Sequence, residues 1–372
     1  MSEKIRVLYI VPSLRLCNGV ASYAMNYFNN IDKSKIQIDF ITGVNEESIY
    51  YDEIKRAGSE IFYIPKIGLK NSFKTIKKIK KFLKENANRY DIIHCHVLNM
   101  GAFYLYYAKK YGIKIRILHS HVTKTADSKS HELRNKILLP IAIKNANFFC
   151  ACSNDAGKQI LKNRKFKIIH NAIDGERFKF NQISRDEIRN KYGIKKDTLV
   201  IGNIGRLCNQ KNQKFLIDIY NVINQKVKNS RLMIVGNGPL EKDLKDIVDK
   251  QSLKDNVIFV ETMPNVEKIY QALDVFVLPS LYEGLGIVLL EAQISGLPCV
   301  VSDVVPKEAK ISDLYKEVSL KDSLEQWANE IINSRQDKRE NNINGLIKNN
   351  YEIEIEAKKL TQYYLQLITE EK

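Results

Sequence analysis

The sequence has few of the residues that hold small secreted proteins or membrane proteins together. Only six cysteines occur among 372 residues; they are scattered and form no Cys-x-x-Cys pair. This excludes a disulfide framework and fits a reducing cytoplasm. No apolar run approaches the ~20 residues of a membrane-spanning helix. The first one, residues 5–11, is short and carries Arg6, so it predicts a strand and not a signal peptide.

Asp-x-Asp, a carboxylate pair at metal-binding spacing, does not occur either. What the chain does have is 44% hydrophobic residues, enough to build full cores. Its length predicts two domains. Short apolar runs alternate with patterns of helical spacing, which predicts an α/β fold. We place the domain boundary near residue 180.

The net charge of +16 belongs to one half of the chain. Residues 1–180 contain 32 Lys and Arg against 15 Asp and Glu, whereas residues 181–372 contain 27 against 28. A basic half beside a neutral half indicates an anionic partner, either a membrane surface or a nucleic acid.

A basic helix is predicted for residues 73–84. Phe73, Ile76 and Ile79 form one apolar stripe, and six lysines occupy much of the rest. This pattern is typical of a core-packed helix with a solvated basic face. It also fits attraction to anionic lipid headgroups, at about 1 kcal/mol per basic residue near the surface.

Four of the six histidines lie near the ends of two predicted strands. His94 and His96 alternate along one strand, and His119 and His121 along the next. Alternate side chains share a face of a sheet, and the carboxyl ends of parallel strands are where ligands bind. Three interpretations stay open: a zinc site, one functional histidine among structural ones, or four structural histidines. No carboxylate at metal spacing accompanies them, which disfavours the zinc site.

The most informative stretch begins with a predicted buried strand at residues 274–279. It continues through Glu283-Gly284-Leu285-Gly286 into a helix that starts near Ile287 and carries Glu291. The glycines allow close backbone approach to a ligand, and a helix start can hold an anion. The two carboxylates suit sugar hydroxyls, which donate hydrogen bonds to them. The alternative is an ordinary strand-to-helix connection with a solvated Glu.

Two cations flank an earlier strand-to-helix turn. Arg206 and Lys211 follow the predicted strand 198–205, and together they would make a diphosphate clamp. Each alone is more often a surface cation. Ser184 and Glu187 have the spacing of a capping box that would open another helix.

The order of these motifs resembles a known family. Gly205-Arg206 with Lys211, then Gly236-Asn-Gly-Pro239, then Glu283 and Glu291 are similar to the donor domain of GT-B glycosyltransferases, specifically the retaining glycosyltransferase family 4. The resemblance covers most of the chain: Asn18-Gly19-Val20 resembles the N-terminal glycine loop, and Asn171-Ala-Ile-Asp174 the inter-domain stretch. Finer details resemble enzymes that extend capsular or exopolysaccharide repeat units.

The resemblance implies two facing Rossmann-like domains with a cleft between them. Residues 1–180 would form the acceptor- and membrane-facing domain, and residues 181–349 the nucleotide-sugar domain. Residues 350–372 would cross back to the first domain. Two positions depart from the family pattern: Asn18 replaces the first glycine of the loop, and residues 261–264 lack the usual glycine near the base.

The resemblance also implies roles for individual residues. Arg206, Lys211, Glu283 and His121 would be catalytic. His121 would contact the transferred sugar, with His119 as the alternative, and His96 and His119 would lie on the acceptor side. The implied donor-binding residues are Gly19, Asn203, Gly205, Arg206, Lys211, Gly236, Gly238, Glu283, Gly284, Leu285, Gly286, Ile287 and Glu291.

The expected activity is transfer of a sugar, with retention, from a nucleotide-diphospho sugar to a lipid-linked or glycan acceptor in bacterial surface polysaccharide synthesis. A UDP-sugar is the expected donor, and no metal or other cofactor is expected. The protein would be cytoplasmic, held peripherally at the inner face of the membrane, without a nucleic-acid partner. The alternatives are a sugar-nucleotide epimerase of the same fold and a basic nucleic-acid-binding protein.

Overall fold

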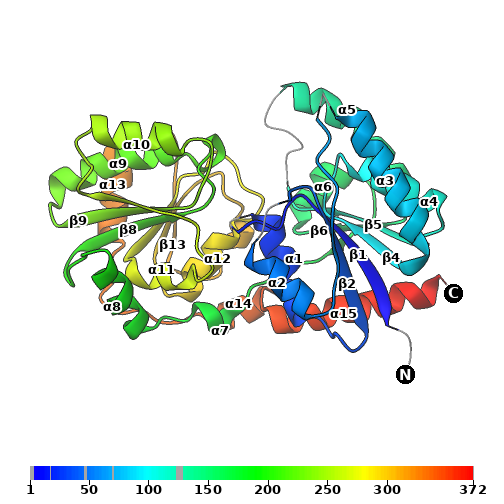
Figure 1. Cartoon of the computed structure of the whole chain (residues 1–372). Coiled ribbons are helices and arrows are strands. Elements are labelled where there is room, and N and C mark those ends of the chain that lie inside the picture. Colours follow the sequence, from blue (N-terminus) through cyan, green and yellow to red (C-terminus); the bar gives the residue numbers. More distant parts are fainter. Residues whose placement is uncertain (1–3, 17, 46–47, 69–70, 123–128, 372) are drawn as a thin grey trace. The chain divides into compact units, whose positions relative to one another are not determined.

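The computed structural model describes residues 4–16, 18–45, 48–68, 71–122 and 129–371 (Figure 1). Contacts divide the chain into two compact units. Unit 1 is Met1–Ala172 with Ile353–Lys372, and unit 2 is Ile173–Glu352. The boundary therefore lies a few residues before position 180. Each unit contains one parallel sheet covered by helices, so the α/β prediction is confirmed.

Unit 1 contains a seven-stranded parallel sheet in the order β3-β2-β1-β4-β5-β6-β7. Its strands are β1 Ile5–Val11, β2 Ile36–Thr42, β3 Ile61–Tyr63, β4 Ile92–Cys95, β5 Ile115–Ser120, β6 Phe148–Ala151 and β7 Lys167–Ile168. The central strands are buried on both faces, as expected for a parallel sheet between two helix layers.

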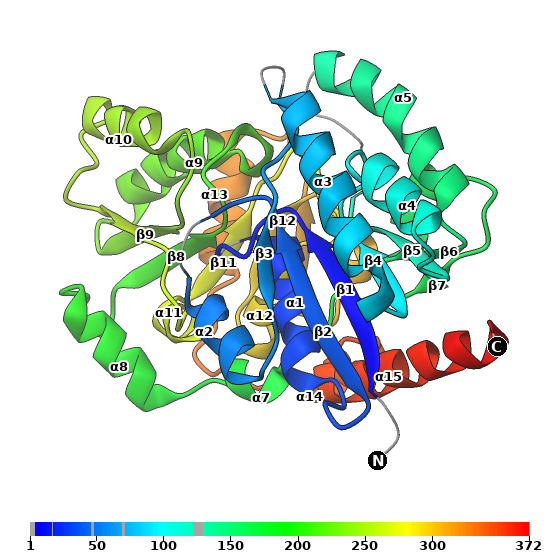
Figure 2. The ribbon, with the colours of Figure 1, turned by 45° about the vertical axis from the view of Figure 1, so that its right-hand side comes forward.

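The helices of unit 1 form two layers. One layer contains α1 (Gly19–Asn30), α2 (Ile49–Arg56) and α15 (Ile353–Glu370), and α1 and α15 lie in contact. The other contains α3 (Ser72–Asn86), α4 (Gly101–Lys110), α5 (Lys129–Asn145) and α6 (Asn154–Leu161), with α3 beside α4 (Figure 2). A short 3-10 helix, η1 (Ala87–Arg89), precedes β4.

The C-terminal helix α15 belongs to unit 1 because its apolar face completes that core. Ile353, Ala357, Leu360 and Leu367 are buried among side chains of β1 and α1. The hydroxyl of Tyr364 lies 2.9 Å from the hydroxyl of Tyr9 on β1. The helix α15 therefore packs on the sheet that starts the chain.

Unit 2 contains a six-stranded parallel sheet in the order β10-β9-β8-β11-β12-β13. Its strands are β8 Leu199–Ile204, β9 Ser230–Val235, β10 Val257–Val260, β11 Val275–Leu278, β12 Cys299–Ser302 and β13 Tyr315–Val318. One face is covered by α7 (Gly175–Phe178), α8 (Gln182–Lys191), α11 (Glu267–Ala272), α12 (Ile287–Ile294) and α14 (Ile343–Lys348). The other is covered by α9 (Gln213–Lys226), α10 (Glu241–Lys250) and α13 (Leu324–Asn333).

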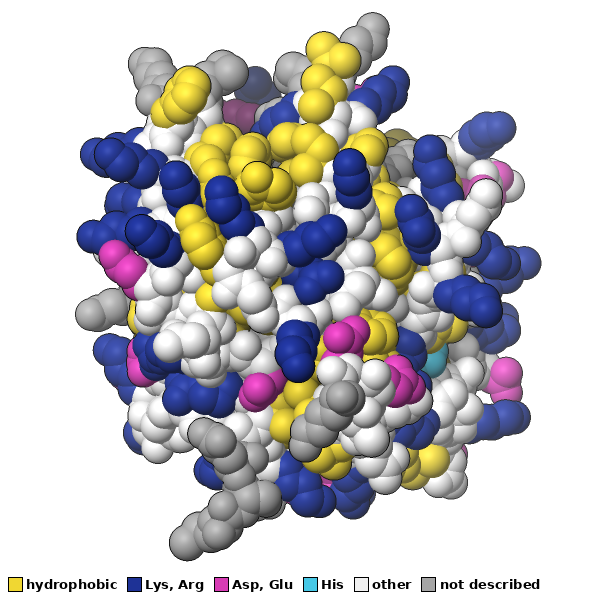
Figure 3. Space-filling model, turned by 90° about the vertical axis from the view of Figure 1, so that its right-hand side faces the viewer, with side chains coloured by type: hydrophobic (Ala, Val, Ile, Leu, Met, Phe, Trp, Pro, Cys, Tyr) yellow, Lys and Arg dark blue, Asp and Glu magenta, His cyan; other side chains and the backbone are white. Residues whose placement is uncertain are grey.

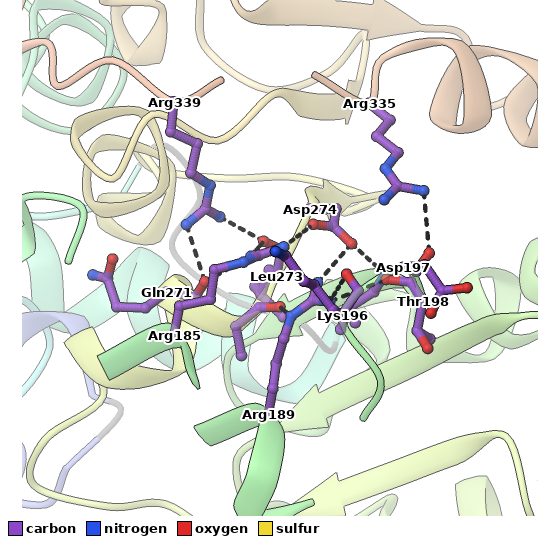
Figure 4. Close-up of polar contacts among 12 residues, drawn as sticks. Arg185, Arg189, Lys196, Asp197, Thr198, Gln271, Leu273, Asp274, Arg335 and Arg339 are labelled. Atoms are coloured by element: carbon purple, nitrogen blue, oxygen red, sulfur yellow. Dashed lines mark hydrogen bonds and ion pairs between the residues drawn. The ribbon is translucent and has the colours of Figure 1, made fainter. Parts of the chain in front are cut away.

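A buried carboxylate fastens α8 to the amino end of the unit 2 sheet. Asp274, just before β11, accepts hydrogen bonds from Arg185 at 2.5 Å, Arg189 at 2.8 Å and the backbone N–H of Val200 at 2.8 Å (Figure 4). Arg339 donates to the backbone carbonyls that end α11. Because these groups lie at the amino ends of the strands, opposite the edge where ligands bind in such sheets, the network is structural.

One predicted helix start was wrong. The helix α8 begins at Gln182, and the side chain of Asn181 accepts the backbone N–H of Ser184 at 2.9 Å. Asn181 is therefore the N-cap, and Ser184 lies inside the first turn. Ser and Asn are both good caps, so the Ser-x-x-Glu spacing alone did not distinguish them. Among the described residues, no helix is both long and apolar enough to span a membrane.

Candidate functional site

The strand order of unit 2 places two loops at one crevice. From β8 the chain adds strands outward to β10 and then returns to the other side of β8 at β11. Such a reversal marks the ligand crevice of open parallel sheets. Gln210, after β8, accepts the N–H of Leu281 at 2.8 Å and donates to the carbonyl of Tyr282 at 3.0 Å. Asn212 donates to the carbonyl of Pro279. The loops after β8 and β11 are therefore held together.

These loops bring Lys211 and Glu283 into direct contact. Lys211 Nζ lies 2.7 Å from Glu283 Oε1, and the two side chains are only 14% and 5% exposed. Ser280 Oγ donates to the same carboxylate oxygen at 2.7 Å. A nearly buried ion pair is stable only when its geometry and additional hydrogen bonds are good. Glu283 is therefore held in one orientation, with a fixed acceptor at the crevice.

The glycines after β8 and β9 are required by packing. A Cβ on Gly236 would lie 2.1 Å from the carbonyl oxygen of Gly205, and a Cβ on Gly238 would lie 2.2 Å from that of Leu207. Any larger residue would push the two loops apart. These glycines therefore allow the loops after β8 and β9 to pack closely, whether or not their own amides contact a ligand.

The start of α12 offers backbone N–H groups to an anion. Gly286 is its N-cap, with φ +78°, and no side chain caps the helix. This left-handed conformation favours glycine. Leu285 points its side chain into the core and Gly284 is half-buried, so only their backbone is available to a ligand. The uncapped amides near Ile287 fit the predicted anion site.

Glu291 lies one further turn along α12 and is held by an aromatic hydroxyl. Tyr270, on α11, donates to Glu291 Oε2 at 2.6 Å. Burial raises the pKa of Glu291 to about 7, although the Tyr270 hydrogen bond acts in the opposite direction. Near neutral pH this carboxyl group therefore exists in both forms, and only the ionised form accepts two hydrogen bonds from a diol without donating one.

Two other predicted donor residues lie in different surroundings. Arg206 is exposed at the end of β8, where a guanidinium can reach a phosphate. Asn203 is fully buried within β8. Its amide donates to the carbonyl of Val277 at 2.8 Å and accepts from Gln213 at 3.3 Å. Asn203 thus connects β8, β11 and α9, and its side chain is engaged inside the sheet.

In unit 1 the four histidines form one hydrogen-bonded ladder. His94 Nε2 lies 3.1 Å from His119 Nδ1, and His96 Nδ1 lies 2.9 Å from His121 Nε2. The rings of His94 and His96 stack at 4.3 Å, and those of His119 and His121 at 4.1 Å. The hydroxyl of Tyr364 lies 2.6 Å from His94 Nδ1. His94 and His96 therefore share a face of the sheet, as do His119 and His121, as their alternation along the strands predicts; the hydrogen bonds between the two strands were not predicted.

Burial keeps this ladder neutral. Desolvation lowers the pKa of all four imidazoles, that of His121 to about 4. His94, His96 and His119 are buried, whereas His121 is half-buried just after β5. Among the four, His121 is therefore the one that is partly exposed at the carboxyl edge of the sheet, with its Nε2 paired to His96 and its Nδ1 buried. A neutral imidazole at this place does not oppose a developing positive charge.

The histidine ladder differs in geometry from a metal site. Ring nitrogens of His94, His96 and His119 lie within 4.8 Å of one another, with no Asp or Glu in that group of described residues. Zinc held by imidazoles at ~2.0–2.1 Å brings ligand atoms to roughly 3.3 Å from one another. To bind zinc, the stacked rings would have to turn. The hydrogen bond between His94 Nε2 and His119 Nδ1 would then be lost. The residues fit a network of neutral imidazoles better than a metal site.

The glycine loop of unit 1 already satisfies part of its helix start. Asn18 Oδ1 accepts the N–H groups of Val20 and Ala21, each at 3.1 Å. A side chain added at Gly19 would meet no atom within 4 Å. A phosphate near Gly19 would have space, but it would have to share these two amides with Asn18.

Sequence reasoning did not find three residues that shape the crevice of unit 2. Gln210 connects the two loops, Ser280 orients Glu283, and Tyr270 tunes Glu291. Ser280 lies three residues before Glu283, a spacing that could have suggested the contact. Tyr270 gave no such signal, because it lies 21 residues before its partner on another helix.

Family models match nearly the whole chain in two parts. Residues 17–177 match "Glycosyltransferase Family 4", and residues 184–352 match "Glycosyl transferases group 1". The chain is 32% identical to the putative glycosyltransferase EpsF of Bacillus subtilis, over 89% of this chain and 88% of that protein. It is 26% identical, over 98% of both chains, to an Escherichia coli UDP-Gal:alpha-D-GlcNAc-diphosphoundecaprenol alpha-1,3-galactosyltransferase.

Solved structures show the same architecture. The structure of Anabaena Alr3699/HepE in complex with UDP-glucose superposes with a TM-score of 0.75, covering 98% of this chain and all of that one at 14% identity. This likeness identifies the fold as GT-B, two Rossmann-like domains, as predicted. From its motifs, its fold and its relatives, the chain belongs to glycosyltransferase family 4.

Proposed function

We propose that the protein transfers a sugar, with retention, from a UDP-sugar to a lipid-diphosphate-linked acceptor during bacterial surface polysaccharide synthesis. The observation that carries the donor part is the crevice of unit 2. There a fixed Glu283–Lys211 pair lies on the loops next to Arg206, the uncapped start of α12 and Glu291. The relatives support the substrates: one acts on a diphosphoundecaprenol-linked sugar, and the HepE structure contains UDP-glucose.

The chemistry needs stabilisation of a leaving diphosphate. The acceptor hydroxyl attacks the anomeric carbon on the face from which the nucleotide departs. The bond to the nucleotide diphosphate breaks, and a phosphate oxygen takes the proton of the hydroxyl. Arg206, Lys211 and the amides near Ile287 offset the charge that develops on that diphosphate, an electrostatic effect of the oxyanion-stabilising kind. With these cations, we propose that no metal ion is needed.

Glu283 and Glu291 recognise two different parts of the donor, the sugar and the ribose. Glu283, oriented by Ser280 and Lys211, accepts hydrogen bonds from hydroxyls of the donor sugar. Glu291 accepts those of the nucleotide ribose. His121, neutral and half-buried, contributes from unit 1 by contacting the transferred sugar.

A membrane-facing surface of unit 1 supports a lipid-linked acceptor. On α5, Leu133, Ile137 and Ile141 are 65%, 61% and 41% exposed and lie four residues apart, hence on one face. Phe73, at the start of the lysine-rich α3, is 91% exposed. Figure 3 looks onto this side of unit 1, where hydrophobic side chains gather among many Lys and Arg.

Apolar side chains ringed by cations suit the boundary between acyl chains and anionic headgroups. We therefore propose that the protein lies in the cytoplasm, peripherally on the inner face of the membrane. The same feature accounts for the positive charge of residues 1–180 without a nucleic-acid partner.

The test is a thermal-shift series with UDP, GDP, ADP and a panel of UDP-sugars, with EDTA present. A ligand that binds only the native protein raises its melting temperature by mass action. Stabilisation by UDP and by one UDP-sugar, undiminished by EDTA, is expected. If no nucleotide shifts the melting temperature, the donor site is wrong. If UDP acts only when a divalent cation is restored, metal independence is wrong.

The preferred UDP-sugar is then incubated with and without a lipid-diphosphate-linked acceptor. Transfer that requires the acceptor is expected. Conversion of the free UDP-sugar to an isomer without any acceptor would instead identify an epimerase.

A further inference from the structure

Unit 1 contains a pocket that the donor chemistry does not use. It has a volume of about 260 Å³ and lies where β1 and β4 end. Val11 is the last residue of β1, and Val97 follows β4. The strand order of unit 1 reverses between β1 and β4, so this is its topological switch point. Open parallel sheets bind their ligands at such a point.

The pocket is apolar with cations at its side. Ile10, Ile64, Met100 and Leu138 contribute hydrocarbon, whereas Lys66 and Arg134 contribute positive charge. None of its described lining residues is an Asp or a Glu. A ligand that fits it therefore combines hydrocarbon with negative charge. A nucleotide fits poorly, because a base and a ribose need several polar partners.

Arg134 is positioned to meet an anion. It is half-buried, and its Nε donates to Asn135 Oδ1 at 3.2 Å. That bond orients the side chain, and a guanidinium carries four further N–H donors in a planar fork. Lys66 lays its stem over Gly43, since a Cβ on Gly43 would lie 2.8 Å from Lys66 Cγ. Both cations thus belong to the wall of the pocket.

The pocket is lined in part by α5, the helix that also carries the exposed apolar residues proposed to meet the membrane. Arg134 and Leu138 line the pocket, and the next residues on the same helix include the exposed Leu133 and Ile137. Hydrocarbon therefore extends from the pocket to the surface along one helix. The pocket itself is slightly below the range of about 300–1,000 Å³ found for complete small-molecule sites. It has space for part of a long ligand.

We propose that this pocket binds the lipid diphosphate of the acceptor. The diphosphate contacts Arg134 and Lys66, the first hydrocarbon units fill the apolar wall, and the rest of the chain leaves along α5 into the membrane. This inference rests on the proposed function, since it names the part of unit 1 that holds the lipid-linked acceptor.

Binding of farnesyl diphosphate, a short soluble isoprenoid diphosphate, tests the proposal directly. It is titrated into the full chain with UDP at saturation, so that the donor crevice is occupied. Inorganic diphosphate and farnesol are titrated in parallel. Farnesyl diphosphate is expected to bind at least about tenfold more tightly than either fragment, because only it satisfies both walls. Equal binding of inorganic diphosphate would mean an ordinary anion site and would overturn the proposal.

Two variants locate the binding. Arg134→Gln is expected to weaken farnesyl diphosphate binding about tenfold or more, and Leu138→Gln to remove the advantage of farnesyl diphosphate over inorganic diphosphate. Lys136→Gln is the matched control, because Lys136 lies on the same helix, is 70% exposed, and does not line the pocket. If Arg134→Gln and Lys136→Gln weaken binding equally, the effect is general surface charge and the pocket is not the site.

The response to UDP separates the two proposals, and an unchanged unfolding transition of unit 1 is the folding control for the variants, because Arg134 and Leu138 belong to unit 1. A variant that still gains thermal stability from UDP has a folded donor unit. Wild-type protein that responds to UDP but not to farnesyl diphosphate contradicts the pocket alone. Binding of farnesyl diphosphate without any response to UDP contradicts the donor assignment and leaves the pocket intact.

Discussion

The two units have the same architecture, but different kinds of side chain follow the central strands of their sheets. In unit 2 the switch point between β8 and β11 presents a paired Lys211 and Glu283 and the uncapped start of α12. In unit 1 the switch point between β1 and β4 opens into a largely apolar pocket with cations at its side. The parallel sheet therefore fixes where a ligand binds, and a few residues after each strand decide which ligand.

The difference extends to how charge is handled. Both units pair a buried carboxylate with arginine, Asp274 in unit 2 and Asp39 in unit 1, but unit 2 also places a nearly buried ion pair, Lys211–Glu283, at its crevice. The buried histidines of unit 1 are kept neutral, because desolvation lowers their pKa values. Its excess cations lie on the surface, on α3 among others. Unit 2 is thus suited to a polar, charged ligand, and unit 1 to an apolar ligand with an anionic end.

The largest expected effect concerns the structural carboxylate of unit 2. Asp274→Ala leaves Arg185 and Arg189 without their common partner in a buried place. Breaking such a buried pair costs about 3–5 kcal/mol of unfolding free energy. Urea unfolding followed with probes in each unit should show an early transition confined to unit 2. Asp313→Ala, at an exposed carboxylate, is the control and should change the free energy by less than about 0.5 kcal/mol.

The next effect removes the fixed charge from the donor crevice. Glu283→Gln keeps the size of the side chain but leaves the Lys211 ammonium unpaired and gives the sugar a weaker acceptor. We expect kcat for sugar transfer to fall about 10²–10³-fold, similar to the loss of one oxyanion-stabilising group. Glu325→Gln, at a 58% exposed carboxylate on α13 that also pairs with a lysine, should leave kcat unchanged. Full activity of Glu283→Gln would show that the crevice is not the catalytic one.

A smaller effect tests the apolar surface of unit 1. The double change Leu133→Gln and Ile137→Gln should weaken binding to phosphatidylglycerol-containing vesicles about tenfold or more, because each side chain loses roughly 1.5–3 kcal/mol of apolar burial. Co-sedimentation measures it. Ile183 on α8 of unit 2 is 72% exposed, so Ile183→Gln is a matched control that should bind normally. If Ile183→Gln weakens vesicle binding as much as the double variant does, the apolar face of α5 is not the membrane-binding surface.

Much of the fold could be predicted because the strands are short apolar runs with clear ends. The strand β1 has the predicted bounds, and the helix after the Glu283 loop starts at Ile287 as expected. The helix α5 was not predicted. Leu133, Ile137 and Ile141 are apolar but exposed, so the helix does not show one apolar and one polar face. It also contains Pro140, a residue that usually ends a helix.

The site could be predicted only where its residues are neighbours in the sequence. The Glu283 loop and Glu291 share one stretch, so their spacing was informative. The contact between Lys211 and Glu283 joins positions 72 residues apart. The pocket of unit 1 joins the carboxyl ends of β1 and β4 to residues inside α5. Only the strand order brings such residues together, and the sequence pattern does not contain it.

The smallest expected effect uses the pKa of Glu291, which burial raises to about 7. Folding then favours the protonated form, so this group's contribution to stability falls as pH rises from about 4.5 to 7. With the ribose bound to Glu291 as proposed, donor binding has the opposite dependence, because the diol donates its hydrogen bonds to the ionised carboxylate. The ionised fraction rises from about one tenth at pH 6 to nine tenths at pH 8. The Kd for UDP, measured calorimetrically, should therefore decrease severalfold over that range.

Tyr270 makes this dependence adjustable. Its hydroxyl donates to Glu291 and lowers the pKa of that carboxyl group from what burial alone would give. Tyr270→Phe removes the donor and should move the midpoint of UDP binding to higher pH. Glu291→Gln should abolish the dependence and leave weak binding at every pH. If the pH profile persists in Glu291→Gln, another group titrates, and the ribose is recognised elsewhere in the crevice of unit 2.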